Sequence, residues 1–595
     1  MDEMIAKVLL QSFLERLDAD ASTDKPQFTG IMSSRERQAL RLLLGGMPQN
    51  EPAPAVLPVE PPSAEQVESG IANTPLVAPA AVPEEVPDRI QPGPRNTEMH
   101  LDEGALSGQQ SQDLRHVLAL DFGTAKSKAF AASIEEENDD PELIELGLGR
   151  RDRDIDGGAY TVSSSIWISN EGLMYVGAEA LRLSMNSHAG VGHRERLDSI
   201  KKIFTLAGGE RNLGVRRLEP KVNPTKVDLT YEDAMCFFLG YLTDLAVTEL
   251  QEKGHSRYIK RRFTVPAWPS AQRDWAASAL SRYLLRAQLL ADTFKARWKD
   301  GVPVEEVKAA VSAAAVHEKQ LGYLLDETGA PGVRKGLLEP LAAGSGRIWA
   351  DNAAKNLVVI VDVGAGTTDF SAFWVVQNIG KPGRRAYAIP PCSGALPMAG
   401  DMLDDILVLE LISRSMGGLT GSMRSEIELD LRLRGARQLK EQLFRLKKLE
   451  VSLITKETIS IELGEFLENP RVKQFGDEVA SAINSFLDNV DSSWSKVPGR
   501  PLLILAGGGA NLPMIQDLGN KVWHMGTGKV VFDRTPELPV SIASRFDTDF
   551  QREYPQLAVA IGGALPVLDE KTTMPQWLGA TTSPGPLERV QLTGI

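Results

Sequence analysis

The chain is poor in cysteine, with only Cys236 and Cys392 among its 595 residues. Two cysteines this far apart exclude a disulfide framework and the paired cysteines of a CxxC metal site. No apolar stretch approaches the ~18 residues that a membrane-spanning helix needs. The N-terminus also lacks the basic-then-apolar pattern of a secretory signal. These absences predict a cytoplasmic protein with no membrane partner.

An excess of positive charge is also missing, because 65 Lys and Arg residues face 79 Asp and Glu residues and the formal net charge is −14. Binding to nucleic acid requires a basic face that neutralises phosphates, so the composition predicts no nucleic-acid partner. The one tight basic run, at residues 260–262, is interpreted as a solvated approach to the strand that follows it. A chain of this length has room for two or three domains with sizeable cores.

Three short segments with glycine turns carry the strongest functional signal. Residues 117–126 read VLALDFGTAK, residues 357–369 read LVVIVDVGAGTTD and residues 502–511 read LLILAGGGAN. Each begins with an apolar run typical of a buried strand and then breaks at glycine. In the first two segments an acid, Asp121 or Asp362, ends the strand two residues before a glycine.

A strand that ends in Asp before a tight Gly-Thr turn brings a carboxylate and backbone N–H groups to one point. That arrangement suits a magnesium polyphosphate, because the N–H groups hold phosphate oxygens and the acid holds the hydrated cation. A single such segment is also good turn chemistry, since Asp caps turns of this kind. Two near-copies followed by a third glycine-rich turn indicate a duplicated nucleotide-binding core.

The composition divides the chain into four parts. Residues 1–46 are predicted to form two short amphipathic helices, the first with Leu9, Phe13 and Leu17 on its apolar face. Residues 47–95 hold 12 of the 36 prolines, and the segment 47–112 is predicted to be a disordered linker. A core with alternating strands and helices follows over 113–566 and predicts α/β layers. Residues 567–595 form a tail.

The three glycine segments resemble the two phosphate loops and the adenosine loop of the ATPase superfamily of actin, the sugar kinases and the seventy-kilodalton heat-shock chaperones. Residues 263–273 (FTVPAWPSAQR) and 338–344 (LEPLAAG) resemble further elements of the chaperone branch, as does the stretch 161–180. The resemblance covers residues 115–566 in the family's order. It implies an actin-like ATPase fold in which two lobes with duplicated βββαβα cores enclose a nucleotide cleft.

The chain also differs from the chaperones in two places. A helical insertion at about residues 284–335 is either surface decoration or a partner site. Only about thirty residues follow the segment 554–564, which resembles the chaperone closing element, so we expect no client-binding sandwich and no helical lid. We therefore expect the protein to act through partners.

The resemblance implies ATP or ADP with Mg²⁺ as ligands and assigns each site residue. The catalytic residues would be Asp121, Lys201, Glu339, Asp362 and Thr367, with Lys202 as the alternative to Lys201. Glu339, before Pro340, would couple hydrolysis to domain motion. The metal site would use Asp121, Asp362 and Asp369. The nucleotide-binding residues would be Gly123, Thr124, Ala125, Lys126, Gly364, Ala365, Gly366, Thr367, Thr368, Gly400, Asp401, Asp404, Lys440, Gly507, Gly508 and Gly509.

The adenosine side departs from the family pattern. Arg437 stands where the family has a ribose-binding glutamate, Asn511 replaces a purine-stacking arginine, and Gln556 replaces an acid. Loss of the stacked cation predicts weaker adenine affinity or a different base preference.

The resemblance implies an ATP-binding and ATP-hydrolysing, chaperone-like protein whose conformation follows its nucleotide. Its protein partners would bind through the N-terminal helices or the helical insertion. Two alternatives stay open: an ATP-dependent small-molecule kinase, and a binding-only or filament-forming actin-like protein that associates with itself. The segments 263–273 and 338–344 favour the first interpretation.

Overall fold

The computed structural model describes the following residues: 99–133, 141–153, 158–186, 194–205, 212–267, 270–326, 336–350, 357–377, 384–415, 420–490, 501–525, 528–534, 540–565 and 569–571. They lie in one compact unit that spans residues 85–595. The predicted helices of residues 1–46 and most of the predicted linker lie outside the described residues. Among the described helices, none combines the length and the apolar character required to cross a bilayer.

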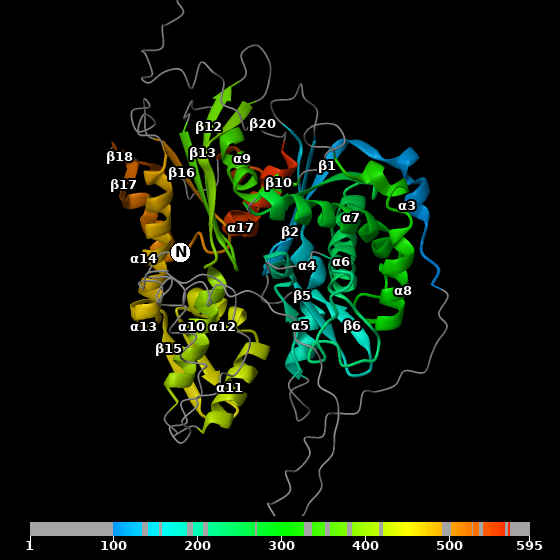
Figure 1. The fold of residues 1–595 in the computed structure, drawn as a ribbon, viewed down its shortest axis with the longest axis horizontal. Helices are drawn as coiled ribbons and strands as arrows, with labels where there is room; N and C mark the ends of the chain where they lie inside the picture. The colour runs from blue at the N-terminus through cyan, green and yellow to red at the C-terminus, as the bar shows by residue number, and fades with distance from the viewer. Residues whose placement is uncertain are drawn as a thin grey trace, which may run out of the picture. The chain divides into compact units, whose positions relative to one another are not determined.

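The fold is mixed α/β and centres on two six-stranded sheets (Figure 1). The first has the strand order β10-β8-β1-β2-β3, with β4 paired to β2, and the second has the order β19-β16-β11-β12-β13-β20. The first sheet contains β1 (Asp113–Asp121), β2 (Lys126–Ser133), β3 (Leu143–Glu145), β4 (Val162–Ser163), β8 (Ile259–Val265) and β10 (Leu337–Leu338). The second contains β11 (Leu357–Val363), β12 (Thr368–Gln377), β13 (Arg384–Leu396), β16 (Leu502–Ala506), β19 (Asp533–Arg534) and β20 (Asp569–Lys571).

The two sheets repeat one topology. In the first, β1, β2 and β3 form an antiparallel meander, and β8 and then β10 add parallel to β1. In the second, β11, β12 and β13 form the same meander, and β16 and then β19 add parallel to β11. All seven residues of β11 are buried, as expected for a central strand covered on both faces. The internal duplication predicted from the glycine segments is therefore present in the strand order.

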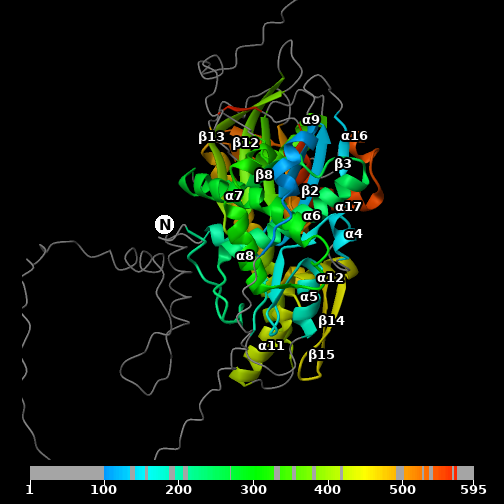
Figure 2. The ribbon, with the colours of Figure 1, turned by 90° about the vertical axis from the view of Figure 1, so that its right-hand side faces the viewer.

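Two helices, α6 (Tyr231–Glu252) and α7 (Ser270–Phe294), pack against the first sheet, and α8 (Val304–Ala315) packs against both of them (Figure 2). Thr230 and Asp233 form a capping box that starts α6. The helices α7 and α8 include much of the predicted insertion, but they are not surface decoration. The buried face of α8, which includes Val307 and Val311, belongs to the main hydrophobic core.

Smaller elements surround each of the two sheets, and we call each sheet with its surrounding elements the first part and the second part of the chain. The first part adds a four-stranded sheet and short helices: β5 (Ser165–Ile168), β6 (Leu173–Val176), β7 (Leu197–Asp198), β9 (Val302–Pro303), α4 (Leu148–Asp152), α5 (Gly177–Asn186) and the 3-10 helices η2 (Ile200–Thr205) and η3 (Gln320–Leu324). The second part adds α10 (Gly400–Ser413), α11 (Gly421–Leu433), α12 (Ala436–Leu446), β14 (Lys448–Ser452), β15 (Thr458–Glu462), α13 (Leu463–Glu468), α14 (Pro470–Asp488), α15 (Pro513–Gln516), η5 (Asp517–Asn520), β17 (Val522–Met525), β18 (Gly528–Val531) and α16 (Val540–Ala543).

Two helices cross between the sheets (Figure 1). The helix α9 (Glu339–Ala350) follows β10 of the first sheet but packs against β11 and β12 of the second. The helix α17 (Thr548–Ala564) lies in the chain between β19 and β20 of the second sheet but packs against β1, β2 and β8 of the first. The two helices also pack against each other, and Gly562 faces the carbonyl oxygen of Ala342 so closely that no side chain would fit.

Both predicted boundaries of the core need correction. The linker was expected to reach residue 112, but α3 (Gly104–Ser107) and the 3-10 helix η1 (Gly108–Ser111) lie within it. Leu101 and Leu106 pack on the core there, so this stretch is ordered by apolar contacts. The polar composition around these two leucines does not reveal those contacts. At the other end, β20 pairs with β13 inside the predicted tail.

Candidate functional site

Two β-hairpins place charged side chains opposite each other at matching positions. Asp121, the last residue of β1, is the direct cross-strand partner of Lys128 on β2. Asp362 on β11 is the direct partner of Asp369 on β12. The spacing is seven residues in both hairpins, so the turns that follow Asp121 and Asp362 have the same length. The repeated topology thus delivers the two strand-end acids from equivalent places.

These residues belong to a buried group that we call the carboxylate cluster. It consists of Asp121, Glu339, Asp362 and Asp369 with Lys128 and Lys201, all buried or nearly so. Lys128 Nζ lies 2.8 Å from Asp121 Oδ2, and Lys201 forms an ion pair with Glu339. Glu339 is the first residue of α9, directly after β10. The cluster therefore lies at the carboxyl ends of parallel strands, where α/β sheets bind their ligands.

Neighbouring hydroxyl groups hold two of the acids. Thr367 donates a hydrogen bond of 2.8 Å to Asp369 Oδ2, and Thr264 on β8 donates one of 3.3 Å to Asp121 Oδ1. Asp369 Oδ1 is buried and has no hydrogen-bond partner of its own among the described residues. A buried carboxylate oxygen without a partner is costly unless a cation or water meets it.

Burial and mutual repulsion raise the pKa values of three of the acids. Burial raises the pKa of Asp362 to about 7, and the nearby Asp369 and Asp121 add to the rise against the opposing charge of Lys128. Burial also raises the pKa of Glu339, although Lys201 opposes it, and burial raises the pKa of Asp369. Burial lowers the pKa of Lys128, but the charge of Asp121 more than offsets that effect and the pKa rises. Extra positive charge would therefore be stabilising here.

The predicted adenosine loop touches the cluster from the side of β16. Gly507 has a positive φ of 83°, and an added Cβ would collide with Asp362 Oδ1 and the carbonyl oxygen of Val363. Only glycine combines this backbone conformation with so close an approach. The amide of Gly507 donates to the Pro555 carbonyl, and that of Gly509 donates to the Val363 carbonyl. These two amides hold the loop in place and are not available to a ligand.

The structure brings the two predicted phosphate loops together. A Cβ built on Gly366 would lie 3.4 Å from Thr124 Cγ2 and 3.1 Å from Lys202 Cε. The start of α10 closes on the second loop, since the Asp401 amide donates to the Ala365 carbonyl at 2.7 Å and the Gly400 amide donates to the Gly364 carbonyl at 3.2 Å. Within that loop, the Gly364 amide is taken by the Thr367 carbonyl, which removes it from the predicted phosphate donors.

Side chains of α12 complete the link between the predicted segments. Lys440 Nζ lies 2.6 Å from Asp404 Oδ1 and donates to the Gly400 carbonyl at 2.7 Å. Lys126, from the first phosphate loop, forms an ion pair of 2.9 Å with Glu441. Every segment predicted to bind nucleotide therefore contacts at least one other such segment or its direct neighbour.

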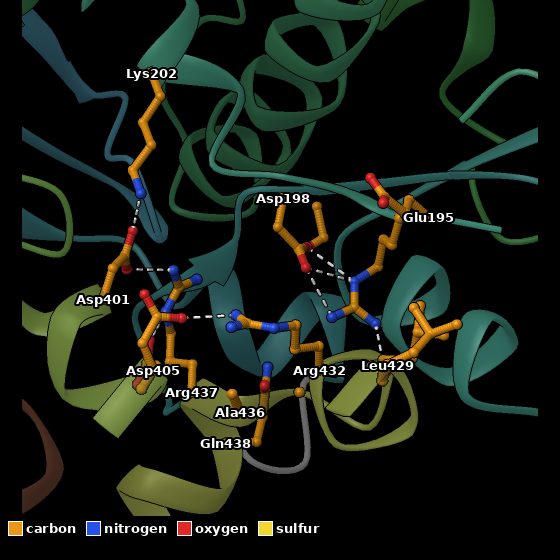
Figure 3. A pocket seen from close by; sticks show the side chains of 15 residues that line it. Glu195, Asp198, Lys202, Asp401, Asp405, Leu429, Arg432, Ala436, Arg437 and Gln438 are labelled. Atoms are coloured by element: carbon orange, nitrogen blue, oxygen red, sulfur yellow. Dashed lines mark hydrogen bonds and ion pairs between the residues drawn. The ribbon is translucent and has the colours of Figure 1, made fainter. Parts of the chain in front are cut away.

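A charged cavity of about 430 Å³ adjoins this region (Figure 3). Its lining combines acids and bases from the segments 195–202, 401–405 and 429–438 and does not include the four acids of the carboxylate cluster. Lys201 and Lys202 connect the two places, because Lys201 pairs with Glu339 in the cluster and Lys202 pairs with Asp401 in the cavity wall. The sequence left open which of the two lysines is the catalytic candidate. In the structure they have separate partners.

Arg437 is held by an acid and a carbonyl group. Its guanidinium donates to Asp401 Oδ1 at 2.9 Å and lies 3.5 Å from the carbonyl oxygen of Ala125. Burial raises the pKa of Asp401, but Arg437 and Lys202 outweigh that effect, so the pKa is lowered and the carboxylate stays charged. The arginine therefore pairs with an acid of α10. Asn511 is exposed, and Gln556 is partly buried on α17.

Several residues of this region were missed by the sequence analysis. Lys128 carried a usable signal, because it stands at the same seven-residue spacing as Asp369. Ser164 carried none, yet its hydroxyl donates to the Gly123 carbonyl at 2.9 Å and its amide donates to the Ala125 carbonyl at 2.9 Å. Arg196 and Arg432, which pair with Asp198 and Asp405 in the cavity, are equally invisible as motifs.

No protein-family model matches this chain, and no curated protein matches it either.

Proposed function

We propose that this protein binds a magnesium nucleotide, with ATP as the first choice, on an actin-like fold whose two lobes are the parts built around the two sheets. The observation that carries the proposal is the pair of strand-end acids, Asp121 and Asp362. They leave equivalent strands of two sheets with one topology and enter a single buried cluster. The family resemblance of the glycine segments supports the same interpretation.

The residues present fit a hydrated magnesium ion. Asp369 Oδ1 lacks a side-chain or backbone partner in the part of the chain that the structure describes, and the raised pKa of Asp362 indicates that the cluster favours added positive charge. Asp121, Asp362 and Asp369 would hold the ion through its waters, because magnesium keeps several of its waters and binds few protein carboxylates directly. When bound, the ion would supply charge that stabilises the phosphate oxygens.

The chain's own residues would position the nucleotide and a water molecule. Lys201, Lys128 and the turn amides that remain available would balance the phosphate charge, since phosphoryl transfer relies on positioning and electrostatics. Asp362, next to the ion, would accept hydrogen bonds from its waters. The charged cavity next to Lys202 would accept the nucleoside or another polar group.

We further propose that hydrolysis changes the contact between the two lobes and that partner proteins respond to the change. The polar links between the parts, such as Lys126 with Glu441 and Lys202 with Asp401, can break and reform more easily than an apolar core. The predicted N-terminal helices would hold a partner. The protein would thus act as a chaperone-like, cytoplasmic ATPase whose conformation switches with its nucleotide.

Phosphate release from ATP by the full chain tests the proposal. We expect turnover that requires Mg²⁺ and falls at least about tenfold in Asp362→Asn, which corresponds to about 1.4 kcal/mol of transition-state stabilisation. Asp477→Asn, an exposed aspartate on α14, is the matched control and should leave turnover unchanged. Turnover that appears only with an added small-molecule acceptor would identify a kinase instead. Nucleotide binding without turnover would identify a binding-only protein.

A further inference from the structure

A second cluster of metal-binding side chains lies at the other end of β1. Asp113 is the first residue of β1 and Asp121 the last, so the two sites are separated by ~26 Å of extended strand. Asp113, His116 and His255 each direct one ligand atom to a common point, and these atoms all lie within 4.8 Å of one another. The rings of His116 and His255 meet edge to face with their centroids 4.6 Å apart.

Local structure fixes each of the three side chains. The amides of Arg115 and His116 donate to Asp113 Oδ1 at 3.0 and 3.1 Å, which anchors the carboxylate. His255 follows the end of α6, where Gly254 has a positive φ of 90° and the His255 amide donates to the Leu250 carbonyl at 2.9 Å. This is the helix-ending pattern that glycine permits, and it sets His255 against the start of β1.

The distances between the ligand atoms suit a tetrahedral ion. Asp113 Oδ2 lies 3.0 Å from His116 Nδ1 and 3.5 Å from His255 Nδ1. Ligands at the usual zinc distance of about 2.0–2.1 Å are separated by ~3.3 Å in a tetrahedron. The side chains are only 7 to 15% exposed, so they are desolvated but still reachable.

A fourth residue orients His116 for such a site. Glu142 Oε2 lies 3.1 Å from His116 Nε2. Carboxylates only accept hydrogen bonds, so Nε2 donates to Glu142, and Nδ1 is the ring atom that faces Asp113. Histidine ligands of zinc commonly donate their second ring N–H to a carboxylate in this way.

We propose that Asp113, His116 and His255 bind a Zn²⁺ ion, with Glu142 as the carboxylate that orients His116. Two imidazoles and one carboxylate form the ligand set that zinc accepts, and they leave a fourth position for water. The ion would tie the start of β1 to the loop after α6 and stabilise this junction. The site is independent of the carboxylate cluster and of any nucleotide.

Titration of the metal-free full-length chain with Zn²⁺ in excess Mg²⁺ tests the site by calorimetry and thermal melting. We expect one zinc ion per chain and a higher melting temperature. His255→Ala should lower the affinity at least about tenfold, and Glu142→Ala about tenfold. Two controls should bind as the unchanged protein does: His317→Ala, on a partly exposed histidine elsewhere, and Asp362→Asn, in the carboxylate cluster.

Two results would overturn the proposal. One is the absence of saturable zinc binding, and the other is an affinity that His255→Ala leaves unchanged. Either would identify the cluster as a hydrogen-bond network only. If His255→Ala fails to fold, Co²⁺ bound to the unaltered chain gives a second readout. Ligation by His116 and His255 should shift two imidazole signals in the proton NMR spectrum. It should also yield visible absorption that Zn²⁺ abolishes. Unchanged NMR and absorption spectra would count against the site.

Discussion

Lys128 lies directly opposite Asp121 in the antiparallel pair of β1 and β2, with its Nζ 2.8 Å from Asp121 Oδ2. The equivalent position in the second hairpin holds Asp369, opposite Asp362. One hairpin therefore neutralises its own strand-end acid, whereas the other adds a second negative charge beside its acid. Burial raises the pKa of Asp362 to about 7, and the charge of Asp369 adds to the rise.

Replacing Lys128 should destabilise the protein strongly. Lys128→Met leaves Asp121 buried with no compensating charge, and loss of one partner of a buried ion pair costs about 3–5 kcal/mol. Thermal melting checks this, with Lys473→Met as the control because its pair with Glu468 is exposed and should contribute about 1 kcal/mol or less. The double variant Asp121→Asn with Lys128→Met should melt higher than Lys128→Met alone. Equal melting of both would show that the charge of Asp121 is not the cause.

Asp362→Asn should stabilise the fold in a pH-dependent way while it reduces turnover. The pKa of Asp362 is raised from the ordinary 3.8 to about 7, so the folded protein binds a proton that the unfolded chain releases. Ionisation therefore lowers the free energy of unfolding progressively from pH 4 to pH 7 and by a constant amount above. The variant, which has no charge to bury, should gain melting temperature at pH 8 in metal-free buffer and gain little at pH 4. A lower melting temperature than the parent at pH 8 would contradict the burial cost.

Gly507→Ala should damage both stability and activity. The positive φ alone costs a non-glycine residue about 1–2 kcal/mol, and the new methyl group would displace Asp362 or Val363. Gly464→Ala is the control, because an added Cβ there meets nothing within 4 Å, its φ is not positive and it lies outside the predicted nucleotide-binding segments. Melting temperature and phosphate release should fall for the first variant and change little for the second. If both variants had similar melting temperatures and similar phosphate release, Gly507 would not be needed to hold Asp362 in place.

Nucleotide should change the separation of the two parts of the chain. Spin labels on Lys253→Cys and Lys473→Cys, both exposed, report that distance by pulsed EPR in a Cys392→Ser background, since Cys236 is buried. We expect different distance distributions without nucleotide, with ADP and with a non-hydrolysable ATP analogue. Pro340→Ala, next to Glu339, should reduce the difference.

A label pair on Lys253→Cys and Lys299→Cys, within the first part, should show no change and serves as the control. Identical distributions of the Lys253 and Lys473 pair in all three states would refute the switch.

The sequence revealed the parts of the site that are local in the chain. Apolar runs that end at Asp and glycine predict β1, β11 and β16 and the turns after them, because a buried strand and a tight turn each leave a short pattern. The cavity could not be found this way. Arg432 and its partner Asp405 are 27 residues apart in the sequence. Arg196 and Leu433, whose carbonyl it contacts, are 237 residues apart. Such pairs depend on how helices pack, which no local pattern records.

Because α9 and α17 cross, each part of the chain contributes a helix to the core of the other part. Phe550, Leu557 and Ile561 of α17 pack with Ala119 and Phe130 of the first sheet, while α9 covers β11 and β12. A cut between residues 350 and 357 would therefore yield two fragments that cannot complete their cores alone. Co-produced, the fragments should reassemble by exchange of their helices, in the manner of a split reporter.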